Sequence, residues 1–326
     1  MPPQPFPREP RAGYAAGVDV GHDHVRMILT DLIGTTLWDR SVAMAVDGDP
    51  QQALDTAAKL IDHAVGETGV PRSHVLGLGL AIACPVDTNG ELHADAIMPG
   101  WVGIRPAHEL AERTGLATRL INDANAGALA ESRFGAAKTH TNAVYLRLST
   151  GIGAALLRDG HVLPGSGGFA GEIGHVTVDP HGAPCRCGNR GCLETVATPP
   201  ALAALLSRAK SHPITPADLP TLITNRDPDA LNAIENAANA IGRALTYTTM
   251  LFTPDLIVIG GTLSIAGPSL LDPIRRTLTR NTTPPHAPHP RIVPSPLGDS
   301  APVRGAAALI RDAVPERPGP EPPITP

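Results

Sequence analysis

The segment from Gly171 to Glu194 carries most of the side chains that could do chemistry. It contains a leading histidine and then three of the chain's four cysteines: His175, Cys185, Cys187 and Cys192. One imidazole and three thiolates are the ligand set of a closed, tetrahedral zinc site. Two carboxylates, Glu172 and Glu194, stand beside these residues. The spacing therefore predicts a structural zinc site that fixes two carboxylates, an arrangement suited to binding a polar small molecule.

Disulfide bonds are the alternative for these cysteines. The N-terminus, MPPQPFPREPRAGY, is polar and proline-rich and has no apolar segment of the kind found in secretory signals. Four cysteines in 326 residues are also far fewer than in disulfide-stabilised domains. We therefore expect a cytoplasmic protein with a metal cluster. Cys84 ends the apolar run VLGLGLAIAC and is expected to be a buried core thiol.

Three further motifs follow predicted strands, and each has a structural alternative. The turns STGIG (149–153) and IGGT (259–262) have glycines that would let backbone N–H groups approach a phosphate, but a hairpin or strand–helix turn looks the same. Asn122 and Asp123 stand between a strand and a helix. They could cap the helix, or Asp123 could act as a general base on a substrate hydroxyl. The local sequence favours the cap.

Composition excludes several classes of protein. Hydrophobic residues make up 42% of the chain and charged residues 17%, which is enough apolar material for a sizeable core. Aromatic residues are only 3% and the net charge is −5, so a nucleic-acid-binding surface is not expected. No apolar run reaches the roughly 20 residues that a membrane helix needs. Prolines gather at both ends, where 1–14 and 315–326 are expected to be disordered tails.

Strands and helices alternate along the chain, which predicts an α/β fold. The expected strands are 15–20, 25–32, 36–46, 75–83, 118–121, 143–148, 153–157 and 256–259, and the expected helices are 51–65, 108–114, one opening at 122, 229–251, 273–279 and 301–314. A strand followed by a glycine-bearing turn and a second strand occurs twice, at 15–32 and at 143–157. This recurrence predicts two similar halves with a cleft between them.

The order of the motifs resembles that of the ROK family of sugar kinases and sugar-responsive repressors, in the actin-like ATPase superfamily. The motifs are a leading Asp19, Asn122-Asp123, STGIG, GEIGH, CRCGNRGCLE and IGGT, and the resemblance covers roughly residues 15 to 314. It implies a two-lobed, ribonuclease-H-like fold around a nucleotide–sugar cleft. The implied lobes are a smaller one, 15–121 plus 302–314, and a larger one with the zinc motif, 122–301.

Matching the family's motifs position by position implies a role for each residue. Asp123 would be the base that takes the proton of a hexose hydroxyl as the oxygen attacks the γ-phosphate of ATP. The sugar-contacting residues would be Asn122, Asp123, Glu172, His175 and Glu194. ATP and its Mg²⁺ would lie against Asp19, Gly21, Thr150, Gly151, Gly153, Gly260 and Gly261. His175 would bind zinc through one ring nitrogen and sugar through the other, with Cys185, Cys187 and Cys192 completing the zinc site.

The first phosphate turn departs from the family's pattern. Family kinases carry Asp-x-Gly-Gly-Thr-Lys, whereas this chain keeps Asp19 and Gly21 and then reads His22-Asp23-His24. His22 would crowd an approaching phosphate, and Asp23 places a carboxylate where an anion would sit. His24 replaces the lysine with a side chain expected to be mostly neutral at physiological pH. Phosphoryl transfer depends on positioning and charge neutralisation, so this turn predicts weak or absent kinase activity.

Three functions follow from the resemblance. Family repressors carry a winged helix-turn-helix ahead of the first strand, but about fourteen proline-rich residues precede it here, so the chain resembles a regulator body without its DNA-binding head. We slightly favour a protein that binds a hexose or amino-hexose with little or no kinase activity. The alternatives are a working glucokinase-like ATP-dependent hexose kinase and, third, a DNA-binding regulator. The resemblance alone implies a homodimer or tetramer, and the sequence does not identify the sugar.

Overall fold

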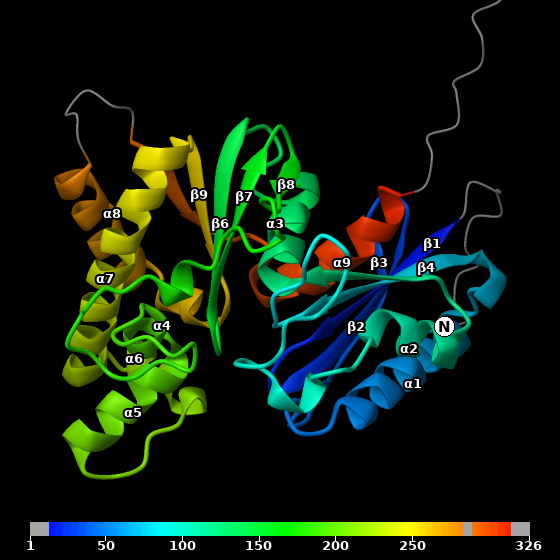
Figure 1. Cartoon of the computed structure of the whole chain (residues 1–326), viewed down its shortest axis with the longest axis horizontal. Helices are drawn as coiled ribbons and strands as arrows, with labels where there is room; N and C mark the ends of the chain where they lie inside the picture. Colours follow the sequence, from blue (N-terminus) through cyan, green and yellow to red (C-terminus); the bar gives the residue numbers. More distant parts are fainter. Residues whose placement is uncertain (1–12, 283–288, 314–326) are drawn as a thin grey trace, which may run out of the picture.

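The computed structural model describes residues 13–282 and 289–313, which form two five-stranded sheets of the same topology (Figure 1). The first sheet has the order β3-β2-β1-β4-β5, and the second has the equivalent order β8-β7-β6-β9-β10. In each sheet the first three strands in sequence are antiparallel neighbours, and the last two run parallel to the first. The strands are β1 (Tyr14–Val20), β2 (His24–Asp31), β3 (Thr36–Ala43), β4 (Val75–Ile82), β5 (Thr118–Asn122), β6 (Asn142–Leu148), β7 (Ile152–Arg158), β8 (His161–Leu163), β9 (Leu256–Gly260) and β10 (Arg291–Pro294).

This arrangement confirms the predicted α/β class and both predicted hairpins. Val20 pairs with Val25 across the first glycine turn, and Leu148 pairs with Ile152 across the second. The lobe boundaries stay a prediction. The tails expected at 1–14 and 315–326 lie outside the described residues except for positions 13 and 14.

Two helices lie between the sheets and join them (Figure 1). Helix α9 (Ala301–Arg311) packs on β1 and β4 of the first sheet, and α3 (Asp123–Phe134) packs on β6 and β7 of the second. The two helices cross where the Cα of Gly305 meets the backbone carbonyl of Ala126, and a Cβ at Gly305 would overlap that carbonyl oxygen. Glycine at this crossing therefore sets how closely the two sheets approach each other.

The other helices cover the outer faces of the sheets (Figure 1). Helices α1 (Pro50–Thr68) and α2 (Pro106–Thr114) cover the first sheet, and α7 (Pro228–Phe252) and α8 (Pro268–Asn281) cover the second. Three shorter helices, α4 (Glu194–Ala197), α5 (Pro199–Lys210) and α6 (Leu219–Thr224), precede α7 in the chain. In the described part of the chain, every helix is too short or too polar to span a bilayer.

The structure corrects several expected elements. The helix expected at 273–279 begins earlier, at Pro268, and Pro273 lies inside it. Proline suits the first turn of a helix, and Pro268 is the proline that occupies it. The third strand ends at Ala43 rather than at 46. Strands β8 and β10 were not predicted, because edge strands of three and four residues carry too little periodicity to be recognised. Helices α4 to α6 were not predicted either.

Candidate functional site

His175 and three cysteines form a compact cluster that could hold a metal ion. The four ligand atoms all lie within 4.8 Å of one another. Nδ1 of His175 is 3.6 Å from Sγ of Cys185, and Sγ of Cys187 is 3.7 Å from Sγ of Cys192. Tetrahedral coordination at about 2.3 Å for sulfur and about 2.0 Å for nitrogen places neighbouring ligands at about these separations. The cysteines are unpaired thiols rather than disulfides, as the sequence predicted.

A tight turn brings the ligands together. The backbone N–H of Cys185 donates to the carbonyl of Asn189, and the N–H of Gly188 donates back to Cys185. Gly188 has φ of +92°, which favours glycine because it has no Cβ. The turn thus presents the thiols of a sequence-local motif to the histidine that precedes it.

The residues expected to contact sugar line one small cavity between the two sheets. They come from three separate segments, namely the β5–α3 junction, the turn before the cysteines and the start of α4: Asn122, Asp123, Glu172, His175 and Glu194. Gly151 and Gly153, expected to contact phosphate, also line this cavity. The cavity holds three further polar side chains that the sequence did not predict: His22, Arg147 and Arg186.

Asn122 serves as a helix cap and also lines the cavity. Its Oδ1 accepts hydrogen bonds from the N–H groups of Ala124 at 2.9 Å and Asn125 at 3.1 Å. Its Nδ2 donates to the carbonyl of Cys84 at 3.1 Å. The cap that the local sequence favoured is therefore confirmed, and the cap fixes the position of the next residue, Asp123. Cys84 is buried, as predicted, and burial raises the pKa of its thiol to about 12.

Asp123 forms a buried ion pair with Arg147, a residue of β6. Their Oδ2 and Nη1 atoms are 2.9 Å apart, and both side chains are about 10% exposed. Burial raises the pKa of Asp123, and the positive charge of Arg147 opposes that shift. Burial disfavours the guanidinium as well, but the charges of Asp123 and Asp19 outweigh it and raise the pKa of Arg147. The carboxylate of Asp123, which the family resemblance implies to be the catalytic base, is thus paired with the guanidinium of Arg147.

Sequence reasoning missed Arg147, although a signal was present. The run AVYLRL is otherwise apolar and lies in a predicted strand, and a charge inside such a strand needs a buried partner. Alternation along β6 places Tyr145 and Arg147 on one face, and Tyr145 packs with residues of α3. Asp123 is the first residue of α3, so the partner could have been inferred from strand period and helix position together.

The two glutamates of the cavity have different surroundings. Oε1 of Glu194 is 2.8 Å from Nε of Arg186, which stands between two of the clustered cysteines. Oε2 of Glu172 is 3.9 Å from Nε2 of His175, the ring nitrogen that faces away from the thiols. Burial, together with the charges of Asp123 and Glu194, raises the pKa of Glu172 to about 7. Glu172 therefore faces the histidine of the cluster, and Glu194 meets the arginine that lies between two of its cysteines.

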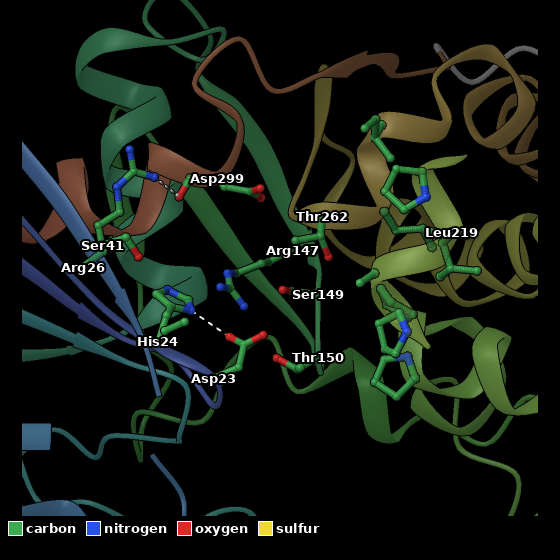
Figure 2. A pocket seen from close by; sticks show the side chains of 18 of the residues that line it. Asp23, His24, Arg26, Ser41, Arg147, Ser149, Thr150, Leu219, Thr262 and Asp299 are labelled. Atoms are coloured by element: carbon green, nitrogen blue, oxygen red, sulfur yellow. Dashed lines mark hydrogen bonds and ion pairs between the residues drawn. The ribbon is translucent and has the colours of Figure 1, made fainter. Parts of the chain in front are cut away.

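A larger cavity of about 540 Å³ adjoins the first (Figure 2). It lies between the first phosphate turn, at Asp23 and His24, and the STGIG turn, at Ser149 and Thr150. Thr150 lines it, and so does Thr262, the last residue of the IGGT turn. Asp19, Gly21, Gly260 and Gly261 are not among the side chains that line either cavity. Gly261 has φ of +84° and packs against the backbone of Leu148, so it lies behind the residues that line the cavity.

The first phosphate turn contains a charged histidine, which corrects the sequence-based expectation. The ring of His24 lies over Gly21, with Nδ1 2.8 Å from Oδ1 of Asp23 and Nε2 3.3 Å from Oδ2 of Asp19. Burial lowers the pKa of His24, but its hydrogen bonds to both carboxylates outweigh burial and raise the pKa to about 9. The expectation that His24 is mostly neutral is therefore wrong, and its charge offsets that of Asp23.

This imidazolium predicts a pH-dependent stability. Because the folded pKa of about 9 lies above the ordinary value of 6.5, the contribution is complete below about pH 6.5 and is lost as the pH rises to about 9. We expect His24→Gln to remove on the order of 2 kcal/mol of this dependence, measured by urea unfolding at pH 6.5 and 9.5. His63→Gln, at an exposed site on α1, is the control. If the free energy of unfolding changed by the same amount between pH 6.5 and 9.5 in His24→Gln and in the parent, the assignment of the charge to His24 would be contradicted.

Comparison with known proteins agrees with this architecture. The family model described as ROK family matches residues 15–313. The xylose repressor of Bacillus spizizenii is 33% identical over 304 residues, covering 92% of this chain and 77% of the repressor. The glucokinase of Thermotoga maritima is 35% identical over 240 residues, covering 69% of this chain and 76% of the kinase.

A solved structure shows the same fold. The ROK family glucokinase from Streptomyces griseus, in complex with glucose and AMPPNP, has a TM-score of 0.82 and 28% identity, and the match covers 92% of this chain and 100% of that one. The two-sheet architecture is thus the sugar-kinase fold of the actin-like ATPases. With both its motifs and its fold matched over nearly all of its length, this chain belongs to the ROK family.

Proposed function

We propose that this protein binds a hexose or an amino-hexose in the smaller cavity, and that its phosphoryl transfer to the sugar is weak or absent. The convergence of five predicted sugar-contacting residues, from three segments, on that cavity carries the proposal. Acidic and amide side chains pair with sugar hydroxyls, and an incorrect sugar leaves these buried groups unpaired. The glucose-bound Streptomyces griseus relative supports a hexose as the ligand class.

We further propose that the cysteine cluster holds a structural zinc ion. His175, Cys185, Cys187 and Cys192 would bind it, and the donor set of three thiolates and one imidazole fits zinc. A closed site of this kind supplies no substrate chemistry and instead fixes the loop. In this chain it would fix His175 with its Nε2 toward Glu172, and the start of α4 with Glu194.

The contacts of Asp123 and His24 argue for weak phosphoryl transfer. As a base, Asp123 would accept the hydroxyl proton, but Oδ1 already accepts the N–H of Ala124 at 2.7 Å and Oδ2 faces Arg147. The first phosphate turn is filled by the ring of His24, whose two nitrogens contact the carboxylates of Asp19 and Asp23. Few groups in this turn are left to neutralise a transferring phosphoryl group. An active ATP-dependent hexose kinase with Asp123 as its base is the second candidate, and the glucokinase relatives support it.

ADP release by zinc-loaded protein separates these candidates. We expect glucose, mannose or N-acetylglucosamine to raise the melting temperature without turnover above background. Turnover that is lost in Asp123→Asn would instead establish the kinase. In that case, the triple variant His22→Gly, Asp23→Thr, His24→Lys should show whether the altered turn limits the rate. If no sugar in the panel changes the melting temperature, the proposed function is wrong.

The remaining expectations stay predictions. A homodimer or tetramer is testable by light scattering after gel filtration. A DNA-binding regulator, the third hypothesis, predicts binding that weakens steeply with salt. The cytoplasmic location rests on the sequence alone.

A further inference from the structure

Arg147 is placed where the two cavities meet. Among the described residues, it is the one that lines both of them. Its neighbours across the sheet are Gly153 on β7 and Gly260 on β9, so no side chain from either strand covers it. Figure 2 shows its guanidinium extending from the second sheet into the larger cavity, toward His24 and Asp23 of the first lobe.

The guanidinium has donor groups that the protein does not use. Arginine has five N–H donors in a planar fork. Among residues 13–282 and 289–313, Asp123 is the one polar side chain that Arg147 contacts. Arg26 of the larger cavity is engaged more fully, because it binds both carboxylate oxygens of Asp39, at 2.9 and 2.8 Å. Arg186, like Arg147, makes one ion pair, with Glu194 in the smaller cavity.

We propose that Arg147 binds a phosphate group at the junction of the two cavities. A fork of N–H donors matches two phosphate oxygens. Because Arg147 is buried, a phosphate bound there would be shielded from water, which strengthens charge-assisted hydrogen bonds. The hydroxyls of Ser149 and Thr150 line the same side of the larger cavity and can donate to the remaining oxygens. The ligand class is therefore a phosphate ester that places its phosphate group beside Arg147, where the two cavities meet.

Two sources share this chemistry. The phosphate could belong to a hexose phosphate whose sugar occupies the smaller cavity, an arrangement that rests on the proposed function. It could instead be the terminal phosphate of a nucleotide in the larger cavity. In both cases the phosphate competes with the carboxylate of Asp123 for one guanidinium. Removing the charge of Asp123 should therefore strengthen phosphate binding, and removing that of Arg147 should weaken it.

Calorimetric titration of the full chain tests the inference. The probes are glucose, glucose 6-phosphate, AMPPNP and inorganic phosphate, and the variants are Arg147→Met, Asp123→Asn and the double variant Asp123→Asn/Arg147→Met. Arg26→Met is the matched control, since it removes an arginine from the same cavity whose Nε and Nη2 donate to Asp39 and whose Nη1 donates to the carbonyl of Asp299. The double variant leaves no unpaired buried charge, so it remains informative if Arg147→Met alone does not fold.

The expected result is that Arg147→Met weakens at least one phosphorylated probe by about tenfold or more and changes glucose affinity little. Asp123→Asn should bind that probe more tightly than the parent does, whereas the double variant should bind it as weakly as Arg147→Met. The probe affected identifies the source, with glucose 6-phosphate indicating a sugar phosphate and AMPPNP a nucleotide. Equal losses for glucose and for the phosphorylated probes, or equal losses in Arg26→Met, would overturn the proposal. If glucose fails to bind while AMPPNP still depends on Arg147, the proposed sugar function fails and the phosphate site stands.

Discussion

Cys192→Ser is expected to remove one zinc ion per chain, lower the melting temperature by about 5–10 °C, and weaken sugar binding by about tenfold or more. The thiol of Cys192 is one of the four clustered donors and is fully buried, so the variant leaves an incomplete ligand set inside the fold. Losing the ion frees the turn that holds Glu172, His175 and Glu194 in one cavity. Metal content by mass spectrometry, thermal unfolding and sugar titration measure the three effects.

Cys84→Ala is the matched control for this prediction. Its thiol is also buried, but it lies outside the cluster and donates to the carbonyl of His93. This variant should keep its zinc, and a chelator should destabilise it as much as it does the parent. A chelator should have no effect on Cys192→Ser. Unchanged metal content in Cys192→Ser, or unchanged sugar affinity after chelation of the parent, would contradict the structural role of the cluster.

Gly305→Ala is expected to lower the free energy of unfolding by about 2 kcal/mol, although alanine is normally the better helix former. The added Cβ would overlap the carbonyl oxygen of Ala126, a backbone atom that no rotamer change can move away. Helices α9 and α3 would have to separate, and α3 carries Asp123 at its first residue. Urea unfolding measures the stability, and sugar titration shows whether the cleft widens.

Gly66→Ala, in the last turn of α1, is the opposite case. A Cβ there would meet no atom within 4 Å, so the substitution should stabilise the protein by about 0.5–1 kcal/mol through helix propensity. The two variants make the same chemical change and differ in what surrounds the new methyl group. If Gly305→Ala were as stable as Gly66→Ala, close packing at the crossing of α3 and α9 would not control the spacing of the sheets.

The sequence predicted the parts of this protein that depend on local pattern. The hairpins around the two glycine turns follow from β-rich runs on either side of a turn, and their pairing confirms them. The clustering of Cys185, Cys187 and Cys192 follows from their spacing within eight positions, because a short turn can hold them only near one another. Short elements such as β8 and β10 were missed because three or four residues do not establish a period.

The charges in the cleft were decided by tertiary structure. The ion pair between Asp123 and Arg147 joins residues that are 24 positions apart, and it exists because α3 packs on the face of β6 that carries Arg147. His24 is charged because folding brings its ring into contact with the carboxylates of Asp19 and Asp23, whose effect on the pKa outweighs that of burial. Motif order and spacing determined the family and the proximity of the three cysteines, since those are properties of residue types in order. Which carboxylate acquires which cation depends on desolvation and distance across the cleft, and only the packed fold sets both.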